Sequence, residues 1–284
     1  MAVPETVAVV GGGTMGAGIT HVFAAAGARV TVVESDETAG EAARVRIAGS
    51  LERAAGKGKL GTGVDEVWAR VDLVAGIAHL PRDADLVVEA VPETPDLKAN
   101  VLAAVERIVG ERTVLASNTS SLSITELAAV LDDPSRFLGM HFFNPVPASR
   151  LVEIVGGQQT AAEVRDRVVD WVRALGKTEV VVRDSPGFAT SRLGVALGLE
   201  AIRMLEEGVA DAEAIDTAME LGYRHPMGPL RSTDVVGLDV RLAIAEYLNS
   251  KLGDRFEPPR LLRDKVARGE LGRKTGQGFY RWEH

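Results

Sequence analysis

A glycine-rich turn near the N-terminus constrains the fold more than any other feature. Gly11, Gly13 and Gly16 have the spacing G-x-G-x-x-G, directly after the apolar run Val7–Val10 and at the start of a helical pattern. In such a turn the first glycine permits a tight bend, the second lets a pyrophosphate approach the backbone, and the third lets the helix pack on the strand. The spacing alone also fits an ordinary glycine-rich turn, but its context favours a dinucleotide site. The residues of this site would be Gly11, Gly13, Thr14, Met15 and Gly16.

An acidic residue follows the next predicted strand. Arg29–Val33 is the second apolar run, and Glu34 comes directly after it, 18 residues beyond Gly16. A carboxylate at this point accepts hydrogen bonds from the adenosine ribose hydroxyls and repels a 2′-phosphate. No arginine follows immediately, so the sequence predicts NAD rather than NADP as the cofactor. Asp36 is an alternative acceptor for the same hydroxyls.

Short apolar strands alternate with helical patterns such as Leu97–Val109 over the first 184 residues. The predicted strands are Val7–Val10, Arg29–Val33, Leu86–Val91, Thr113–Ala116, Phe137–Phe143, Leu151–Val155 and Glu179–Val182. This alternation is typical of βαβ units whose parallel sheet is buried on both faces. The sequence therefore predicts an α/β fold with an N-terminal Rossmann domain over residues 1–184.

Strand-like patterns largely disappear after Asp184. Ser185-Pro186-Gly187 forms a break, and the apolar periodicity beyond it predicts helices over Leu193–Glu207, Ala212–Leu221 and Asp234–Leu252. A glycine follows each of these segments, as is common beyond helix ends. The sequence therefore predicts a second, all-α domain over residues 185–284.

Composition excludes several classes of function. The chain has no cysteine, and its 5 histidines lack metal-ligand spacing, so no metal site is expected. A net charge of −8 is poorly suited to following a phosphate backbone, so nucleic acid is not expected as a partner. No apolar stretch approaches the roughly 20 residues needed to span a bilayer. We expect a soluble, cytoplasmic protein without a membrane partner.

One histidine lies where proton transfer is plausible. Hydride removal from an alcohol requires a base for the hydroxyl proton, and histidine titrates near neutrality. His141 precedes a proline-containing turn, and Glu153 lies in the apolar run Leu151–Val155. If the chain reverses around Pro147, His141 and Glu153 face each other, and the carboxylate would fix the imidazole tautomer. Spacing alone leaves open that His141 is a packed structural histidine and Glu153 an exposed residue of an edge strand.

Five segments together resemble one family, the L-3-hydroxyacyl-CoA dehydrogenases, which includes the bacterial 3-hydroxybutyryl-CoA dehydrogenases. They follow the family's order over nearly the whole chain: Val10–Ile19, Asp85–Glu93, Ala116–Leu122, Gly139–Glu153 and Leu271–Tyr280. The resemblance implies reversible, NAD-dependent oxidation of an (S)-3-hydroxyacyl-CoA to the 3-oxoacyl-CoA in fatty acid metabolism, with a short acyl chain. It also implies an acyl-CoA as the small-molecule partner and a homodimer formed through the C-terminal domain.

The resemblance assigns roles to individual residues. His141 would be the catalytic acid/base with Glu153 as its partner, and Ser120 would bind the C3 oxygen of the substrate near the nicotinamide. Contacts with NAD are implied for Glu34, Glu93, Lys98, Ser120, Asn144 and Lys274. Contacts with the substrate are implied for Ser50, Lys57, Ser120 and Ser191.

Most of these residues also have a purely structural interpretation. Ser120 could cap the following helix, Glu93 could favour a helix start, and Lys98 could be a surface helix residue. Positions in solvated loops or turns would also account for Lys57, Asn144 and Lys274.

Two positions depart from the family's pattern. The family usually has asparagine where Ser191 stands in Pro186–Arg192. Serine keeps a donor and an acceptor on a shorter arm, so a water molecule could bridge to the substrate. This departure leaves two alternatives open: a dehydrogenase of a free hydroxy acid such as a sugar acid, and a dinucleotide-binding protein that has lost catalysis. His21 stands where many relatives carry glutamine, which we interpret as a neutral substitution in a helix.

Overall fold

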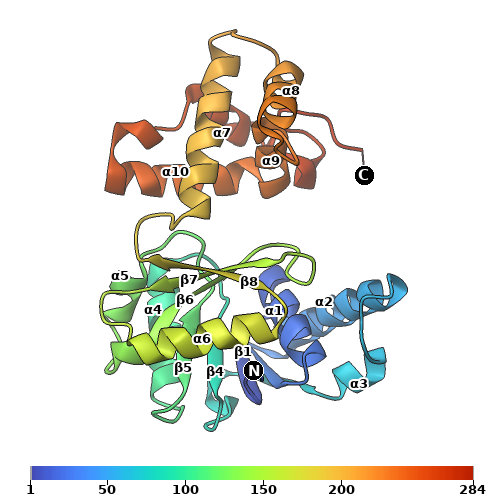
Figure 1. The fold of residues 1–284 in the computed structure, drawn as a ribbon, viewed down its shortest axis with the longest axis vertical. Coiled ribbons are helices and arrows are strands. Elements are labelled where there is room, and N and C mark those ends of the chain that lie inside the picture. The colour runs from blue at the N-terminus through green and yellow to red at the C-terminus, as the bar shows by residue number, and fades with distance from the viewer. Residues whose placement is uncertain (1, 284) are drawn as a thin grey trace. The chain divides into compact units, whose positions relative to one another are not determined.

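The computed structural model describes residues 2–283, and the chain divides into two compact units (Figure 1). Unit 1 comprises residues 1–184 and unit 2 residues 185–284. Unit 1 contains all the named strands, whereas unit 2 is built from helices. The predicted fold class, an α/β domain followed by an all-α domain, is confirmed.

Unit 1 is organised around one eight-stranded sheet with the strand order β3-β2-β1-β4-β5-β6-β7-β8. Its strands are β1 (Thr6–Val10), β2 (Arg29–Glu34), β3 (Val71–Ala75), β4 (Leu86–Glu89), β5 (Val114–Ser117), β6 (Phe137–Phe142), β7 (Leu151–Gly156) and β8 (Thr178–Arg183). Neighbouring strands are parallel, as predicted, except that β6 and β7 run antiparallel. The sequence did not predict β3, a partly exposed edge strand whose side chains lack a clear apolar alternation.

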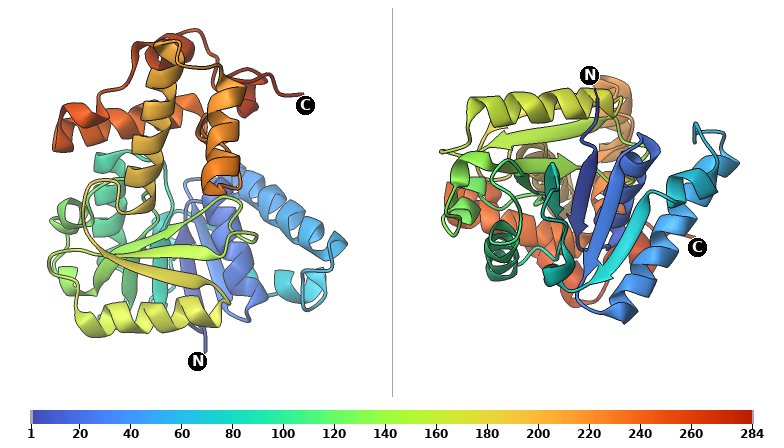
Figure 2. Two further views of the ribbon diagram at one scale, coloured as in Figure 1. Left: turned by 45° about the horizontal axis from the view of Figure 1, so that its top comes forward. Right: turned by 90° about the horizontal axis from the view of Figure 1, so that it is seen from below.

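Helices lie on both faces of this sheet (Figures 1 and 2). They are α1 (Thr14–Ala25), α2 (Glu37–Gly56), α3 (Val64–Trp68), α4 (Pro95–Glu106), α5 (Ile124–Ala128) and α6 (Ala162–Ala174). Local chemistry explains their starts: Asp36 caps α2, Pro95 opens α4, and Ser123 caps α5. The cap of α5 is therefore Ser123 and not Ser120, so the structural interpretation of Ser120 as a cap is wrong.

Apolar residues of the central strands and the covering helices form the core of unit 1. Val9 and Val88 of the strands are 0% exposed, and so are Phe23 of α1 and Ile47 of α2. Burial on both faces leaves the strand ends as the places where polar residues can emerge. The carboxyl ends of the parallel strands β1, β2, β4, β5 and β6 meet at one edge of the sheet.

Unit 2 consists of five α-helices and two short 3₁₀ turns over the described residues. The helices are α7 (Thr190–Glu206), α8 (Ala212–Tyr223), α9 (Pro229–Val236), α10 (Leu238–Leu252) and α11 (Arg260–Ala267). The single helix predicted over Asp234–Leu252 is wrong, because Gly237 adopts φ 105° and separates α9 from α10. The predicted end of α8 before Gly222 is also wrong: α8 continues to Tyr223 and stops at Arg224, whose φ is 58°.

Two buried carboxylates, here called the clasp carboxylates, hold the C-terminal segment 271–282 on unit 2. Asp234 is 0% exposed and accepts hydrogen bonds from the backbone N–H groups of Phe279 (2.8 Å) and Tyr280 (2.9 Å) and from Trp282 Nε1 (2.8 Å). Asp216 accepts a hydrogen bond of 2.7 Å from the Tyr280 hydroxyl. These bonds fix a segment that has almost no regular structure of its own.

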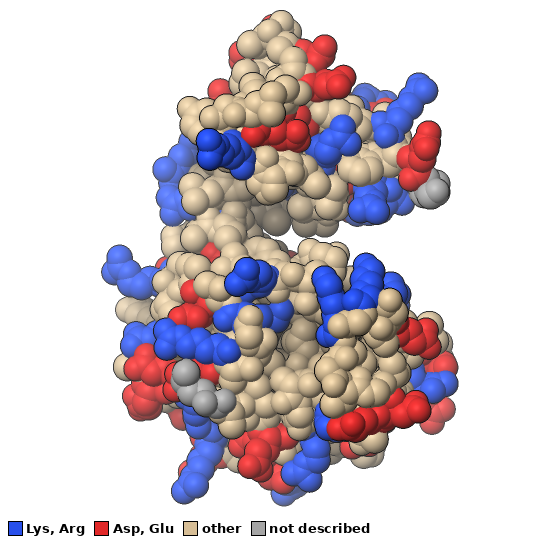
Figure 3. Space-filling view, turned by 45° about the vertical axis from the view of Figure 1, so that its right-hand side comes forward, with Lys and Arg blue, Asp and Glu red and all other residues tan. Residues whose placement is uncertain are grey.

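Charged side chains of both signs are interspersed on the face drawn in Figure 3. Among the helices described over residues 2–283, none is long and apolar enough to cross a bilayer. The same residues contain no cluster of three or more acidic or histidine side chains that could hold a metal ion.

Candidate active site

The glycine turn between β1 and α1 has the geometry of a dinucleotide-binding loop. Gly11 has φ 96° and donates its N–H to the Val33 carbonyl at 2.9 Å. A Cβ atom on Gly16 would overlap the Gly11 carbonyl, so the close approach of helix and strand requires glycine there. At Gly13, by contrast, a Cβ atom would meet no protein atom within 4 Å. The chain itself therefore gives no reason for glycine at position 13, whereas the approach of a pyrophosphate to the backbone does.

Glu34 and Asp36 have different surroundings, which separates the two candidates for the ribose acceptor. Glu34 ends β2 and accepts a hydrogen bond of 2.6 Å from the N–H of Gly12, inside the glycine turn. Asp36 caps α2 through the N–H of Ala39 at 2.8 Å and also accepts from Ser35 Oγ at 2.9 Å. Because Asp36 is committed to the helix start, the geometry favours Glu34.

His141 and Glu153 are direct register partners across the antiparallel strands β6 and β7. The imidazole Nδ1 lies 2.8 Å from Glu153 Oε2. His141 is 6% exposed and Glu153 is 0% exposed. The strand β7 pairs with β8 on its other side, so Glu153 is not an exposed residue of an edge strand. The predicted chain reversal, and the predicted facing of these two residues, are confirmed.

This pairing fixes the roles of the two imidazole nitrogens. An ionised carboxylate can only accept hydrogen bonds, so Nδ1 carries the hydrogen that it donates to Glu153. The Nε2 atom of His141 is then the nitrogen that can take or give a proton. A positive imidazolium would be stabilised by the buried carboxylate beside it.

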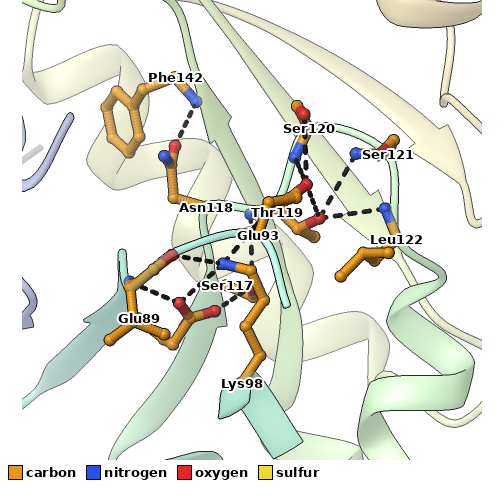
Figure 4. Close-up of polar contacts among 11 residues, drawn as sticks. Glu89, Glu93, Lys98, Ser117, Asn118, Thr119, Ser120, Ser121, Leu122 and Phe142 are labelled. Atoms are coloured by element: carbon orange, nitrogen blue, oxygen red, sulfur yellow. Dashed lines mark hydrogen bonds and ion pairs between the residues drawn. The ribbon is translucent and has the colours of Figure 1, made fainter. Parts of the chain in front are cut away.

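A polar network joins the loops that follow β4 and β5 (Figure 4). Glu93 Oε1 accepts hydrogen bonds from Thr119 Oγ1 at 2.6 Å, from the Ser120 N–H at 2.8 Å and from Ser120 Oγ at 3.2 Å. Lys98 Nζ lies 3.3 Å from Glu93 Oε2 and 2.8 Å from Glu89 Oε1. Lys98 is 1% exposed, so its interpretation as a surface helix residue is wrong.

Asn118 connects the same loop to the strand that carries His141. Its side-chain Oδ1 accepts a hydrogen bond of 2.9 Å from the N–H of Phe142. Its own N–H donates to the Glu89 carbonyl at 2.8 Å. The ends of β4, β5 and β6 are thereby cross-linked beside His141.

The residues implied to contact the CoA moiety lie along α2. Ser50 Oγ is 2.8 Å from His21 Nδ1, and Lys57 stands at the end of the same helix, two turns further on. Burial, together with the smaller effects of the positive charges of Lys177 and Arg53, lowers the pKa of His21 to about 4. His21 is therefore a neutral, 4% exposed partner of Ser50. The interpretation of His21 as a neutral helix substitution overlooks this contact.

The remaining predicted site residues occupy simpler positions. Asn144 is exposed at the start of the turn between β6 and β7. In unit 2, Ser191 lies in the first turn of α7, and Lys274 forms an ion pair with Asp239 at 2.6 Å. The functional roles of these residues stay predictions.

Sequence reasoning missed several residues that organise the site. They are His21, Glu89, Ser117, Asn118 and Thr119. A usable signal was present for Glu89 and Ser117, because each is a polar residue that ends a fully buried strand. Polar groups at the carboxyl ends of parallel strands are the usual site-forming residues of such folds.

A dinucleotide turn and a histidine–carboxylate pair on one α/β unit define a nicotinamide-dependent dehydrogenase. The family description "3-hydroxyacyl-CoA dehydrogenase, NAD binding domain" matches residues 6–185, and "3-hydroxyacyl-CoA dehydrogenase, C-terminal domain" matches residues 187–282. The chain therefore belongs to the 3-hydroxyacyl-CoA dehydrogenase family. It is an NAD-dependent 3-hydroxyacyl-CoA dehydrogenase, an oxidoreductase of fatty acid metabolism, and its cofactor is NAD.

Two of the similar proteins carry names from this family, and a third is named for a different substrate. The chain is 44% identical over 281 residues to a protein of Bacillus subtilis named a probable 3-hydroxybutyryl-CoA dehydrogenase, with 98% of both chains covered. It is similar to the solved structure of (S)-3-hydroxybutyryl-CoA dehydrogenase from Ralstonia eutropha, with 42% identity, a TM-score of 0.93, and coverage of 99% of this chain and 100% of that one. A third similar structure is a 5-formyl-3-hydroxy-2-methylpyridine-4-carboxylic acid 5-dehydrogenase, at 32% identity and a TM-score of 0.78, covering 100% of this chain and 92% of that one.

Proposed function

We propose that the substrate pair is (S)-3-hydroxybutyryl-CoA and acetoacetyl-CoA, interconverted reversibly with NAD. The buried pair of His141 and Glu153, 2.8 Å apart, carries the proposal for the chemistry. The short acyl chain is supported by the similarity to 3-hydroxybutyryl-CoA dehydrogenases of two bacteria.

In the proposed mechanism His141 moves the proton. Its Nε2 removes the C3 hydroxyl proton, and a hydride leaves C3 at the same time, so C3 becomes a carbonyl carbon. NAD supplies the hydride acceptor when bound. Glu153 stabilises the imidazolium, and Ser120 orients the C3 oxygen. A positioned base of this kind contributes about 10² to 10⁴ in rate.

The other predicted residues complete the two binding sites in this proposal. The glycine turn and Glu34 would hold the pyrophosphate and the adenosine ribose of NAD. Glu93, Asn144 and Lys274 would serve the cofactor, and Ser50, Lys57 and Ser191 the acyl-CoA.

We also propose a homodimer formed through unit 2. Large apolar side chains of this unit are exposed: Leu193 by 71%, Leu221 by 78% and Tyr223 by 76%, together with Val235, Val236 and Val240. Exposed apolar side chains that form a contiguous patch commonly mark a protein interface. Light scattering after size-exclusion chromatography should give twice the 30.1 kDa chain mass. Location in the cytoplasm stays a prediction from the sequence.

The function is tested by NADH consumption with acetoacetyl-CoA, beside free acetoacetate and beside NADPH. Turnover with the thioester and NADH alone supports the proposal. His141→Ala should lower kcat by about 10⁴-fold while NADH still binds. Turnover with longer 3-oxoacyl-CoA substrates only would contradict the short-chain assignment.

A second candidate, a free hydroxy acid as substrate, is favoured by one comparison. The pyridine-carboxylic-acid dehydrogenase, 32% identical to this chain, is named for a substrate that is not a CoA thioester. Faster turnover of free acetoacetate than of its thioester would support this alternative. Replacing Lys57 with Ala separates the two, because a loss of thioester affinity is expected only if the CoA moiety binds near α2.

A further inference from the structure

Residues 143–150 form the turn that joins the strand of His141 to the strand of Glu153, here called the β6–β7 turn. Asn144, a proposed cofactor contact, is exposed near its start. Among the residues of this turn only Val146 is buried, with 2% of its surface exposed. Contacts from other elements must therefore hold the turn in place.

Lys177 provides the first of these contacts. It lies between α6 and β8 and is 9% exposed. Its Nζ atom donates hydrogen bonds to the Val146 carbonyl at 2.7 Å and to the Ser149 carbonyl at 2.6 Å. Hydrogen bonds from a charged donor are shorter and stronger than neutral ones. Both bonds end in the β6–β7 turn, so the ammonium group holds this turn at two points.

The charge of Lys177 serves no acidic side chain. Within residues 2–283 it forms no ion pair, and burial lowers its pKa. A buried cation is unfavourable unless hydrogen bonds compensate for the water that it loses. The two carbonyls of the turn are the acceptors that compensate, so the position of the ammonium and that of the turn depend on each other.

The second contact is the packing of Val146 on α1. A Cβ atom on Gly18 of α1 would lie 2.8 Å from the Cβ atom of Val146, so the turn lies directly against this helix. The glycine turn, which in the proposed function binds the NAD pyrophosphate, leads into the same helix. Asn144 stands two residues before Val146. The β6–β7 turn is therefore attached to Lys177 and also to the helix of the proposed cofactor site.

We propose that Lys177 is a positioning residue for NAD, and that it acts by keeping Asn144 in place. The proposal rests on the proposed role of Asn144 as a cofactor contact. His141 and Glu153 are held by the pairing of β6 with β7, so Lys177 should affect cofactor binding more than proton transfer. The loss of one hydrogen bond to the cofactor corresponds to about tenfold in affinity.

Lys177→Met tests the proposal by removing the ammonium group while keeping most of the side-chain length. We expect the NADH dissociation constant, measured by fluorescence titration, to rise about tenfold. At saturating NADH, kcat and the KM for acetoacetyl-CoA should stay within about threefold of wild type. Unchanged NADH affinity with a raised KM for the thioester would overturn the proposal.

Lys265→Met is the matched control for stability. Lys265 of unit 2 also donates to a backbone carbonyl, that of Gly278 at 2.8 Å, and pairs with Glu270 at 2.7 Å. Each of the two lysine variants should lower Tm by about 5 °C, because each leaves acceptors without their donor. The control should keep the NADH dissociation constant within about twofold of wild type. Equal weakening of NADH binding by both variants would overturn the proposal.

Gly18→Ala disturbs the other attachment and keeps the proposal testable if Lys177→Met does not fold. Alanine favours the helix, but its Cβ atom would displace Val146 from α1. We expect the NADH dissociation constant to rise at least threefold, which is about half the tenfold effect on a logarithmic scale. An unchanged constant would show that NADH binding does not depend on the place of the turn, and would overturn the proposal.

Asn144→Ala shows whether the effect passes through Asn144. In wild type this change should weaken NADH binding about tenfold, but in the Lys177→Met background by less than about threefold, because the contact is already lost. Additive losses would refute the path through Asn144. Full NADH affinity of Asn144→Ala in wild type would show that the proposed role of Asn144 is wrong, and the proposal would fail with it. NADH binding is measured without substrate, so these outcomes do not depend on which acyl-CoA is turned over.

Discussion

Both units bury carboxylates, but different groups donate hydrogen bonds to them. In unit 1, Glu89 and Glu153 are 0% exposed and are bonded mainly to the side chains of lysine, serine and histidine, with one further bond from the Val91 N–H to Glu89. In unit 2, the clasp carboxylates Asp216 and Asp234 are bonded to backbone N–H groups and to the aromatic side chains of segment 271–282.

The difference reflects what each architecture has to satisfy. The sheet of unit 1 pairs its own backbone, so acids at its strand ends can bond to side chains that move protons or orient a substrate. Unit 2 must hold an irregular C-terminal segment, whose buried N–H groups need acceptors. The buried carboxylates Glu89 and Glu153 therefore belong to the candidate site of unit 1, whereas Asp216 and Asp234 fix loops of unit 2; Glu106 of unit 1, which accepts from the N–H groups of Asp132 and Asp133, resembles the latter.

Among the tests of this comparison, Glu153→Gln should have the largest effect, and the effect should be on kcat. The amide keeps the size of the side chain but removes the charge that stabilises the imidazolium, and it can bond to the wrong imidazole tautomer. We expect kcat to fall by about 10³-fold, with Tm and NADH affinity close to wild type. Steady-state kinetics measures kcat, and calorimetry measures Tm and the NADH affinity. A large loss of Tm with an unchanged kcat of the folded fraction would mean that Glu153 resembles the clasp carboxylates.

Asp234→Asn should have the opposite profile. Asp234 accepts hydrogen bonds from Phe279 N–H, Tyr280 N–H and Trp282 Nε1. The NH₂ group of an asparagine cannot accept, so at least one of these three N–H groups would face another donor. The free energy of unfolding should fall by about 3 kcal/mol, measured by urea denaturation. Asp211→Asn is the control. Asp211 caps α8 at an exposed site, and asparagine is as effective an N-cap as aspartate. Equal losses from the two changes would contradict the clasp interpretation.

Local patterns were enough to predict the parts of the site that lie close together in sequence. The glycine turn needs only its own spacing, and the equal distances of His141 and Glu153 from Pro147 were enough to pair them. Lys98 could not be assigned in this way. A lysine in the first turns of a helix is usually at the surface, and its partner Glu89 lies on a strand.

Local sequence patterns also predicted only part of the fold. Central strands have continuous apolar runs, but the edge strand β3 is partly exposed and lacks that signal. The break at Gly237 interrupts a pattern whose apolar periodicity continues on both sides, so one helix was predicted where α9 and α10 lie. Backbone conformation at a single glycine decides this point.

We expect a smaller effect on stability in acid from His21. This buried histidine of unit 1 is hydrogen-bonded to Ser50, a neutral partner. Burial lowers its pKa from 6.5 to about 4. The unfolded chain therefore binds this proton more readily, so the stabilising contribution is complete above pH 6.5 and is lost as pH falls toward 4. We expect this loss to be about 2 kcal/mol in wild type and absent in His21→Gln. Ser50→Ala should keep it, because burial is the main cause; equal acid slopes in wild type and His21→Gln would contradict this expectation.

The smallest effect tests whether unit 2 contributes to chemistry at all. Ser191 lies in the first turn of α7, at the position where the family usually has asparagine. If Ser191 contacts the substrate through a water molecule, Ser191→Asn should restore a direct bond and raise kcat/KM for acetoacetyl-CoA by about fivefold, near 1 kcal/mol. Ser191→Ala should lower it by a similar factor, and both variants should keep the wild-type Tm. If neither changes kcat/KM, Ser191 has no role at the substrate. A change in both would support the proposed contact of Ser191 with the acyl-CoA and show that a polar group of unit 2 serves the reaction beside the buried acids of unit 1.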